Sequence, residues 1–187
     1  LESAPVRSVG PHRGDRRSPS EQRPEWRRRR RFHRLGNGDE PARIEDGPDA
    51  CLDRVDDLFD ALLGTTRTIP GQLWGVGIGV PGPVEFETGR PISPPIMPGW
   101  DRYPIRERFS ARYGAPVWVD NDVNLLALGE WRSGVAAGHD NVVVIKVGTG
   151  IGAGIISDGR IHRGAQGSAG DVGHIQVLDD PAVVCRC

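Results

Sequence analysis

Three polar residues in a row, Asp120, Asn121 and Asp122, stand at the end of the apolar segment 116–120. We predict a buried strand over this segment, and open α/β sheets bind ligands beyond the carboxyl ends of their strands. A carboxylate there can accept a proton from a substrate hydroxyl, and a neighbouring asparagine can orient that hydroxyl. The same residue types also cap helices, and the pattern alone favours this capping role.

A second candidate site is the glycine-rich segment 148–154 (GTGIGAG), which begins with Gly148, Thr149 and Gly150 and continues through Gly152 to Gly154. Glycines let backbone N–H groups approach a phosphate, and the threonine adds a hydroxyl. Because the segment leads into a strand and not into a helix, it is not the Rossmann dinucleotide fingerprint. A tight β-hairpin explains the pattern equally well.

The third candidate combines His174 with Cys185 and Cys187, residue types that suit zinc. A structural zinc site takes four ligands, and only these three are visible, so the predicted site is incomplete in this chain. A hydrogen-bonded loop histidine and two free thiols are the alternative. Cys51 falls within a predicted helix and is more consistent with a core position.

The elements that would position these residues alternate between helices and apolar strands, which predicts an α/β architecture. Amphipathic patterns predict helices over 50–63, 105–113 and 123–137. In the first of these, one apolar face holds Leu52, Val55, Leu58, Phe59, Leu62 and Leu63. Apolar runs predict strands over 73–80, 116–120, 141–147 and 151–156, and Asp158-Gly159 predicts a type I′ hairpin turn.

Charge is distributed unevenly along the 187 residues, although the formal net charge is −1. Residues 1–36 hold 11 arginines against 4 acids, whereas the remainder is acidic by 8 charges. This first stretch has no periodic apolar pattern, so we predict disorder within a first unit, 1–45. Five consecutive arginines could neutralise nucleic-acid phosphates, but a solvated basic tail or an out-of-frame translation of GC-rich DNA is favoured.

Composition excludes several classes of protein. No apolar run reaches the length of a membrane span, so we expect no membrane insertion. The 3 cysteines cannot form a disulfide framework, and no secretory signal is visible, which together favour a cytoplasmic location. The chain contains a single lysine, Lys146, against 23 arginines, a usage that suggests a GC-rich gene.

From residue 73 onward the chain resembles the ROK family (repressors, open reading frames, kinases), whose fold is the actin-like ATPase, or ribonuclease H-like, fold. The matching motifs are 77–83 (GIGVPGP), 98–100 (PGW), 120–124 (DNDVN), 128–130 (LGE), 147–154 (VGTGIGAG), 164–170 (GAQGSAG), 173–174 (GH) and 185–187 (CRC). The resemblance implies two lobes of a partial fold, 46–136 and 137–187, that is truncated at both ends.

The resemblance also implies roles for the candidate residues. Asp122 would be the general base that activates a sugar hydroxyl toward the γ-phosphate of ATP, and Asn121 would hold the sugar. A phosphate-binding loop would be formed by Gly148, Thr149, Gly150 and Gly152. Asp171 stands where family kinases have a sugar-binding glutamate. His174 would contact the sugar and ligate zinc with Cys185 and Cys187.

Several departures weaken the case for a kinase. No Asp-x-Gly-x-Thr phosphate loop precedes Leu73, Ile96 replaces a sugar-binding asparagine, and Asp171 is one methylene shorter than glutamate. We therefore expect the sugar-binding effector domain of a sugar-responsive transcriptional regulator, whose helix-turn-helix DNA-binding domain is not in this chain. The alternative is an ATP-dependent sugar kinase, which would also require Mg²⁺. Because members of this family are often dimers or tetramers, the resemblance also implies a homo-oligomer.

Overall fold

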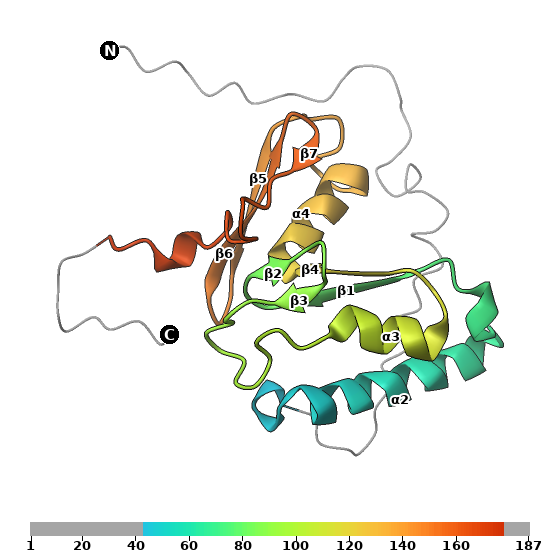
Figure 1. Ribbon diagram of the computed structural model, residues 1–187. Coiled ribbons are helices and arrows are strands. Elements are labelled where there is room, and N and C mark those ends of the chain that lie inside the picture. Colours follow the sequence, from blue (N-terminus) through green and yellow to red (C-terminus); the bar gives the residue numbers. More distant parts are fainter. Residues whose placement is uncertain (1–42, 178–187) are drawn as a thin grey trace, which may run out of the picture. The chain divides into compact units, whose positions relative to one another are not determined.

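The computed structural model describes residues 43–177, within one compact unit that spans Glu40–Cys187 (Figure 1). Its longer elements are α2 (Pro48–Thr66), β1 (Val76–Val80), β2 (Val84–Glu85), β3 (Arg90–Pro91), α3 (Ile105–Tyr113), β4 (Val117–Asn121), α4 (Asp122–Ser133), β5 (Val142–Val147), β6 (Ile151–Ser157) and β7 (Arg160–Ile161). Short 3₁₀ turns are η1 (Ile44–Asp46), η2 (Pro70–Gln72) and η3 (Val172–His174). The predicted α/β class is confirmed. The disorder predicted for 1–45 falls almost entirely outside the described residues.

Two sheets carry the candidate residues. β1 and β4 pair in parallel, with Val76 opposite Val117 and Val80 opposite Asn121, so both strands end at the same edge. β5, β6 and β7 form an antiparallel sheet in sequence order. The β6–β7 turn has positive φ at both Asp158 (50°) and Gly159 (69°), which confirms the predicted type I′ hairpin. β2 and β3 make a short separate ladder.

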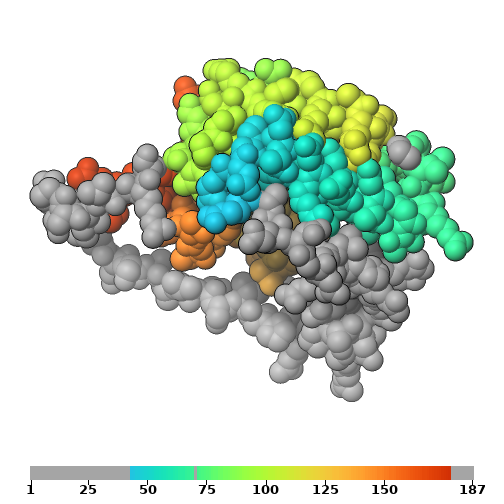
Figure 2. Space-filling model, turned by 90° about the horizontal axis from the view of Figure 1, so that it is seen from below, coloured from blue at the N-terminus to red at the C-terminus, as the bar shows by residue number. Residues whose placement is uncertain are grey.

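The core of the first part lies between β1–β4 and the two helices α2 and α3. Alternation along β4 turns Val117 and Val119 into this core, where they meet the α3 side chains Ile105, Phe109 and Tyr113. α4 packs mainly against β5 and β6, and it also contacts β1 and β4. Figure 1 shows α2 and α3 running side by side, and Figure 2 shows the same pair, in cyan-green and yellow-green, from below.

Helix ends agree with the sequence pattern where the signal is local. α3 has the predicted bounds, and Gly114 closes it with a left-handed φ of 62°. α2 runs past the expected stop at Gly64 and ends at Thr66, where Arg67 adopts the left-handed conformation. The third helix was predicted to reach residue 137 but ends at Ser133. There the Glu130 carboxylate folds back to accept a hydrogen bond from the Val135 backbone N–H at 2.9 Å.

The strand predicted over 73–80 is shorter than expected, because β1 begins only at Val76. The preceding residues belong to the turn η2 and to the link that follows it. Trp74, in this link, is 97% exposed. The apolar run therefore predicted the strand correctly but placed its first residue three positions too early.

The apolar face predicted for α2 is only partly buried. Leu52 is buried, and Phe59 and Leu63 pack partly against the core. Val55 and Leu62, by contrast, are about two-fifths exposed, at 40% and 38%. The prediction was wrong for these two side chains because α2 turns the carboxylate of Asp56, 5% exposed, toward α3.

Hydrogen bonds from α3 satisfy this buried carboxylate. Arg108 donates from Nη2 to Asp56 Oδ2 at 2.7 Å, and the Tyr113 hydroxyl donates to Asp56 Oδ1 at 3.0 Å. Arg108 also bonds the more exposed Asp53 at 2.6 Å. A buried charge is tolerated only when it is paired and hydrogen-bonded in this way, so polar contacts set the register of the two helices.

Tyr113 makes this contact sensitive to alkaline pH. Burial is the main cause that raises the pKa of its phenol from 10.0 to about 12. The unfolded chain therefore loses this proton at a lower pH than the folded chain. The stabilisation is complete below about pH 10 and is lost as the pH rises to about 12. We expect the denaturation midpoint to fall across this window, and to fall less in the Tyr113→Phe variant. An equal fall in both proteins would contradict this assignment.

Candidate functional site

Asp120, at the end of β4, is a buried anchor rather than an exposed carboxylate. Its side chain is 3% exposed, because it points away from the Val119 side of the strand and under the connection that follows β7. Its Oδ1 accepts hydrogen bonds from the Asn121 backbone N–H at 2.8 Å and from Asn124 Nδ2 at 2.9 Å. Its Oδ2 accepts from Arg163 Nε at 2.9 Å. These bonds leave Asp120 a structural role.

Asn121 is the N-cap of α4, which confirms the capping interpretation. Its Oδ1 accepts from the backbone N–H groups of Val123 at 2.8 Å and Asn124 at 3.2 Å. Its Nδ2 donates to the carbonyl of Gly82 at 2.9 Å, which joins the loop after β1 to the start of the helix. An amide nitrogen has two hydrogens, so one donor remains for a ligand, and the predicted sugar contact stays a prediction.

Asp122 is the first residue of α4, and its carboxylate forms an ion pair with Lys146. The Lys146 Nζ donates to Asp122 Oδ2 from β5, where Lys146 lies opposite Gly152. The two side chains are 46% and 30% exposed, for lysine and aspartate respectively. Sequence reasoning missed this partner of the predicted base. The one available signal was that Lys146 is the only lysine in the chain.

The segment from Gly148 to Gly150 forms the turn between β5 and β6, which confirms the hairpin interpretation. The Gly148 N–H donates to the Gly150 carbonyl at 2.9 Å. A Cβ added to either glycine would meet nothing within 4 Å. The turn, with Thr149 at its centre, is therefore open to a ligand, and the predicted contact with a nucleotide phosphate stays a prediction.

The later glycines of the same motif serve close packing. A Cβ on Gly152 would lie 3.0 Å from Val123 Cγ2. One on Gly154 would lie 2.5 Å from both the Ala127 Cβ and the Val123 carbonyl oxygen. These glycines let α4 lie directly on β6. The structure thus places Gly152 beneath the first turn of α4, beside the residue that follows Asp122.

The connection after β7 runs along the part of β6 that β7 leaves unpaired, and it carries Asp171 and His174. The Ala153 N–H donates to the Gly170 carbonyl at 2.8 Å, and a Cβ on Gly173 would lie 2.3 Å from the Ile151 carbonyl oxygen. Burial raises the pKa of the Asp171 carboxyl, while His174 opposes that rise. Both predicted residues therefore border the first residues of β6, as the Asp122–Lys146 pair does.

Two of the predicted zinc ligands, Cys185 and Cys187, lie outside the described residues, 43–177. Within this described range, no group of three histidine, cysteine, aspartate or glutamate side chains is arranged to hold a metal ion. His174 itself is exposed at the end of η3. Zinc binding stays a prediction.

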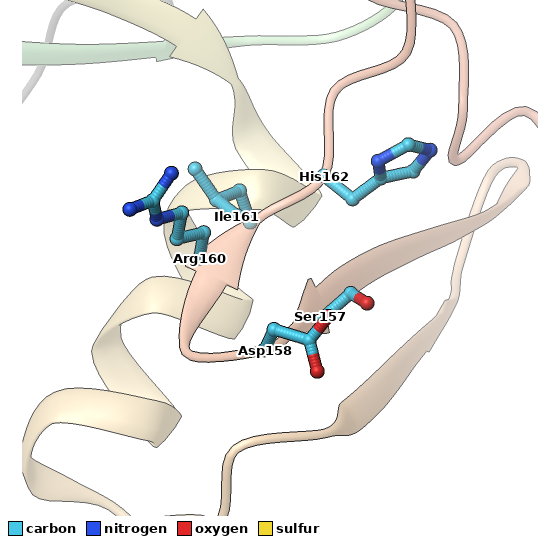
Figure 3. Close-up of a pocket in the computed structure, with 5 residues that line it drawn as sticks. All are labelled: Ser157, Asp158, Arg160, Ile161 and His162. Atoms are coloured by element: carbon cyan, nitrogen blue, oxygen red, sulfur yellow. The ribbon is translucent and has the colours of Figure 1, made fainter.

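A surface hollow of about 460 Å³ lies elsewhere, at the β6–β7 hairpin, and is lined by Ser157, Asp158, Arg160, Ile161 and His162. Figure 3 shows the Arg160 and His162 side chains pointing in different directions, so they do not converge on a ligand. None of the candidate residues lines it. We therefore place the candidate site at the strand ends around Asp122 and not in this hollow.

The chain is similar in sequence to one protein family and to individual proteins of known function. The ROK family matches residues 44–187. A glucokinase of Halalkalibacterium halodurans is 35% identical over 147 residues, covering 79% of this chain and 44% of the relative. A xylose repressor of Caldicellulosiruptor bescii is 36% identical over 147 residues, covering 78% of this chain and 36% of the repressor.

A solved structure agrees with these sequence matches. The ROK family glucokinase from Streptomyces griseus, in complex with glucose and AMPPNP, superposes with a TM-score of 0.55 and 35% identity. The superposition covers 66% of this chain and 40% of that enzyme. The chain thus spans about two-fifths of the length of the relatives it matches. Within residues 43–177, no helix is long and apolar enough to cross a membrane. The chain belongs to the ROK family and carries part of its actin-like ATPase fold.

Proposed function

We propose that this chain is the sugar-binding effector part of a sugar-responsive transcriptional regulator. The observation that carries the proposal is the ion pair between Lys146 and Asp122. A general base must accept a proton from the sugar hydroxyl, through a carboxylate oxygen that is free to approach it. Here Asp122 Oδ2 already accepts from an ammonium group. With Oδ2 engaged by this cation, we infer that Asp122 holds a sugar hydroxyl through its second oxygen, Oδ1, rather than removing the hydroxyl proton.

The same pair suits sugar recognition. Lys146 supplies donors and Asp122 supplies acceptors, so together they match two neighbouring hydroxyls of a sugar, one accepting and one donating. Both side chains are partly exposed, and an exposed ion pair contributes only about 0–1 kcal/mol. A sugar can reach both partly exposed side chains without first separating the pair. The remaining amide hydrogen of Asn121 lies on the adjacent residue and supplies a further donor.

The relatives do not decide between regulator and kinase, because the xylose repressor and the glucokinase are almost equally similar, at 36% and 35% identity. A specific observation supports the kinase as the second candidate: Cβ positions at Gly148 and Gly150 are unobstructed. The turn residues Gly148, Thr149 and Gly150 would hold the nucleotide, and Mg·ATP would supply the transferable phosphoryl group. Asp122 would then have to be released by Lys146.

Calorimetric titration with glucose and xylose, together with a coupled phosphorylation assay, tests the proposal on purified protein that contains this chain. We expect sugar binding without ATP-dependent turnover. Asp122→Asn should weaken sugar binding by about tenfold or more, since each factor of ten is about 1.4 kcal/mol. Asp57→Asn, at an exposed position on α2, is the matched control and should bind as the parent protein does.

Two results would overturn the proposal. Phosphorylation of a sugar that is abolished by Asp122→Asn would establish the kinase instead. Absence of binding to any sugar tested, by protein that melts cooperatively, would remove the effector role. Lys146→Met separates the two candidates further. In a regulator it should weaken sugar binding and yield no turnover, because a donor is lost. In a kinase it should raise turnover, because the base is released.

A further inference from the structure

Arg163 joins the loop after β7 to the end of β4. Its Nε lies 2.9 Å and its Nη2 lies 2.8 Å from Asp120 Oδ2. The Asp120 side chain is 3% exposed and that of Arg163 is 23% exposed, so the pair is largely shielded from water. Removal of one partner from such a pair leaves an uncompensated buried charge. The contact therefore holds the first residue of the loop firmly against β4.

A second contact fixes the guanidinium plane of Arg163. Its central carbon lies 3.7 Å from the centroid of the Phe86 ring. Phe86 is itself held in place, because its carbonyl accepts a hydrogen bond from Arg106 Nη2, on α3, at 2.5 Å. A planar cation stacked on an aromatic ring and bonded to a carboxylate has little rotational freedom.

The loop that Arg163 begins is closed by one hydrogen bond and attached to the strands at two further places. The Ala169 N–H donates to the Arg163 carbonyl at 3.1 Å, which closes the loop. Gly167 has φ +74° and lies so near β2 that a Cβ would be 2.3 Å from the Val84 carbonyl oxygen. The Gly170 carbonyl accepts from the Ala153 N–H. Asp171 and His174 follow directly, so their position depends on this anchored loop.

We propose that Arg163 is a positioning residue of the sugar site, and this inference rests on the proposed function. By binding Asp120, it sets the segment with Asp171 and His174 in a defined relation to Asn121 and Asp122. A ligand that contacts both groups then meets a prearranged site. Binding is stronger when the site does not have to be ordered first. Arg163 itself need not contact the sugar.

The test compares amide hydrogen exchange without ligand with sugar affinity. The double variant Asp120→Asn with Arg163→Met removes both charges together, so that neither is left buried alone. We expect exchange in residues 168–174 to accelerate by about tenfold or more, while α3 and β5 remain as protected as in the parent protein. Glucose and xylose affinity should fall by a similar factor, about tenfold. The single variant Arg163→Lys keeps the positive charge. Its hydrogen exchange in residues 168–174 and its sugar affinity should therefore lie between those of the parent protein and those of the double variant.

Arg90→Met is the matched control, because Arg90 pairs with Glu107 at 2.6 Å on an exposed part of the surface. This variant should change neither the hydrogen exchange of residues 168–174 nor the affinity for glucose and xylose. Exchange that accelerates throughout the unit would show a general structural role and overturn the inference, as would unchanged exchange in 168–174. If the parent protein binds no sugar but hydrogen exchange in residues 168–174 still accelerates in the double variant, Arg163 remains the anchor of the loop. That result would instead refute the sugar-binding function.

Discussion

Asp56→Ala is expected to lower the free energy of unfolding by about 3–5 kcal/mol, the cost of breaking a buried ion pair from one side. The change removes the acceptors of Arg108 Nη2 and of the Tyr113 hydroxyl, both on α3. Among the described residues, Arg108 Nη2 would keep only the exposed Asp53 as an acceptor, at 2.6 Å. The Tyr113 hydroxyl would keep only Asp60 Oδ1, at 3.3 Å. The guanidinium and the phenol would be left between the helices without this carboxylate.

Asp53→Ala is the matched control for this change. Asp53 bonds the same Arg108 at 2.6 Å, but its side chain is 73% exposed. An exposed pair contributes about 0–1 kcal/mol, so this variant should unfold close to the parent protein. Urea denaturation followed by circular dichroism measures both. Similar losses in the two variants would show that burial of Asp56 is not what makes its ion pair important.

Gly154→Ala has the second large expected effect, a loss of about 2–3 kcal/mol in the free energy of unfolding. The new Cβ would lie 2.5 Å from the Ala127 Cβ and from the Val123 carbonyl oxygen. Neither atom belongs to a side chain that can rotate away. The whole of α4 would have to move off β6, and with it the helix end that carries Asn121 and Asp122.

Gly150→Ala provides the comparison within the same motif. Its Cβ would meet nothing within 4 Å, so stability should change by less than about 0.5 kcal/mol. Thermal melting of both variants measures the difference. A Gly154→Ala protein that melts with the parent protein would refute the close packing of α4 on β6. A large loss in Gly150→Ala would show that the turn has a structural demand that its open surroundings do not reveal.

The parts of the fold that could be predicted depend on local signals. α3 has the predicted bounds because an N-terminal proline, Pro104, and the left-handed Gly114 stand directly at its ends. The ends of the other two helices were missed because Gly64 is tolerated inside α2 and the Glu130 carboxylate ends α4 early. The exposure of Val55 and Leu62 was also missed, since an apolar stripe does not reveal a buried aspartate paired with another helix.

In the candidate site, too, only the residues that a local pattern marks could be predicted. The position of Asn121 and Asp122 at a strand end follows from a short apolar run before polar residues. Their partners do not, because Lys146 is 24 residues away from Asp122, and Arg163 is 43 residues from Asp120. Such pairs form only when β5 and the β7 loop are brought back onto the first sheet. Tertiary contact, which no local pattern encodes, completes the site.

The glycines of residues 147–154 carry a consequence for how such chains evolve. Gly152 and Gly154 are required where α4 rests on β6, whether or not any nucleotide binds at the turn before them. A lineage that loses catalysis therefore remains under selection to keep half of the motif. Its descendants will continue to look like kinases in sequence long after phosphoryl transfer has gone. The informative positions for separating sensors from enzymes are then those free of packing duties, Gly148 and Gly150, and the residue paired with the aspartate at the helix start.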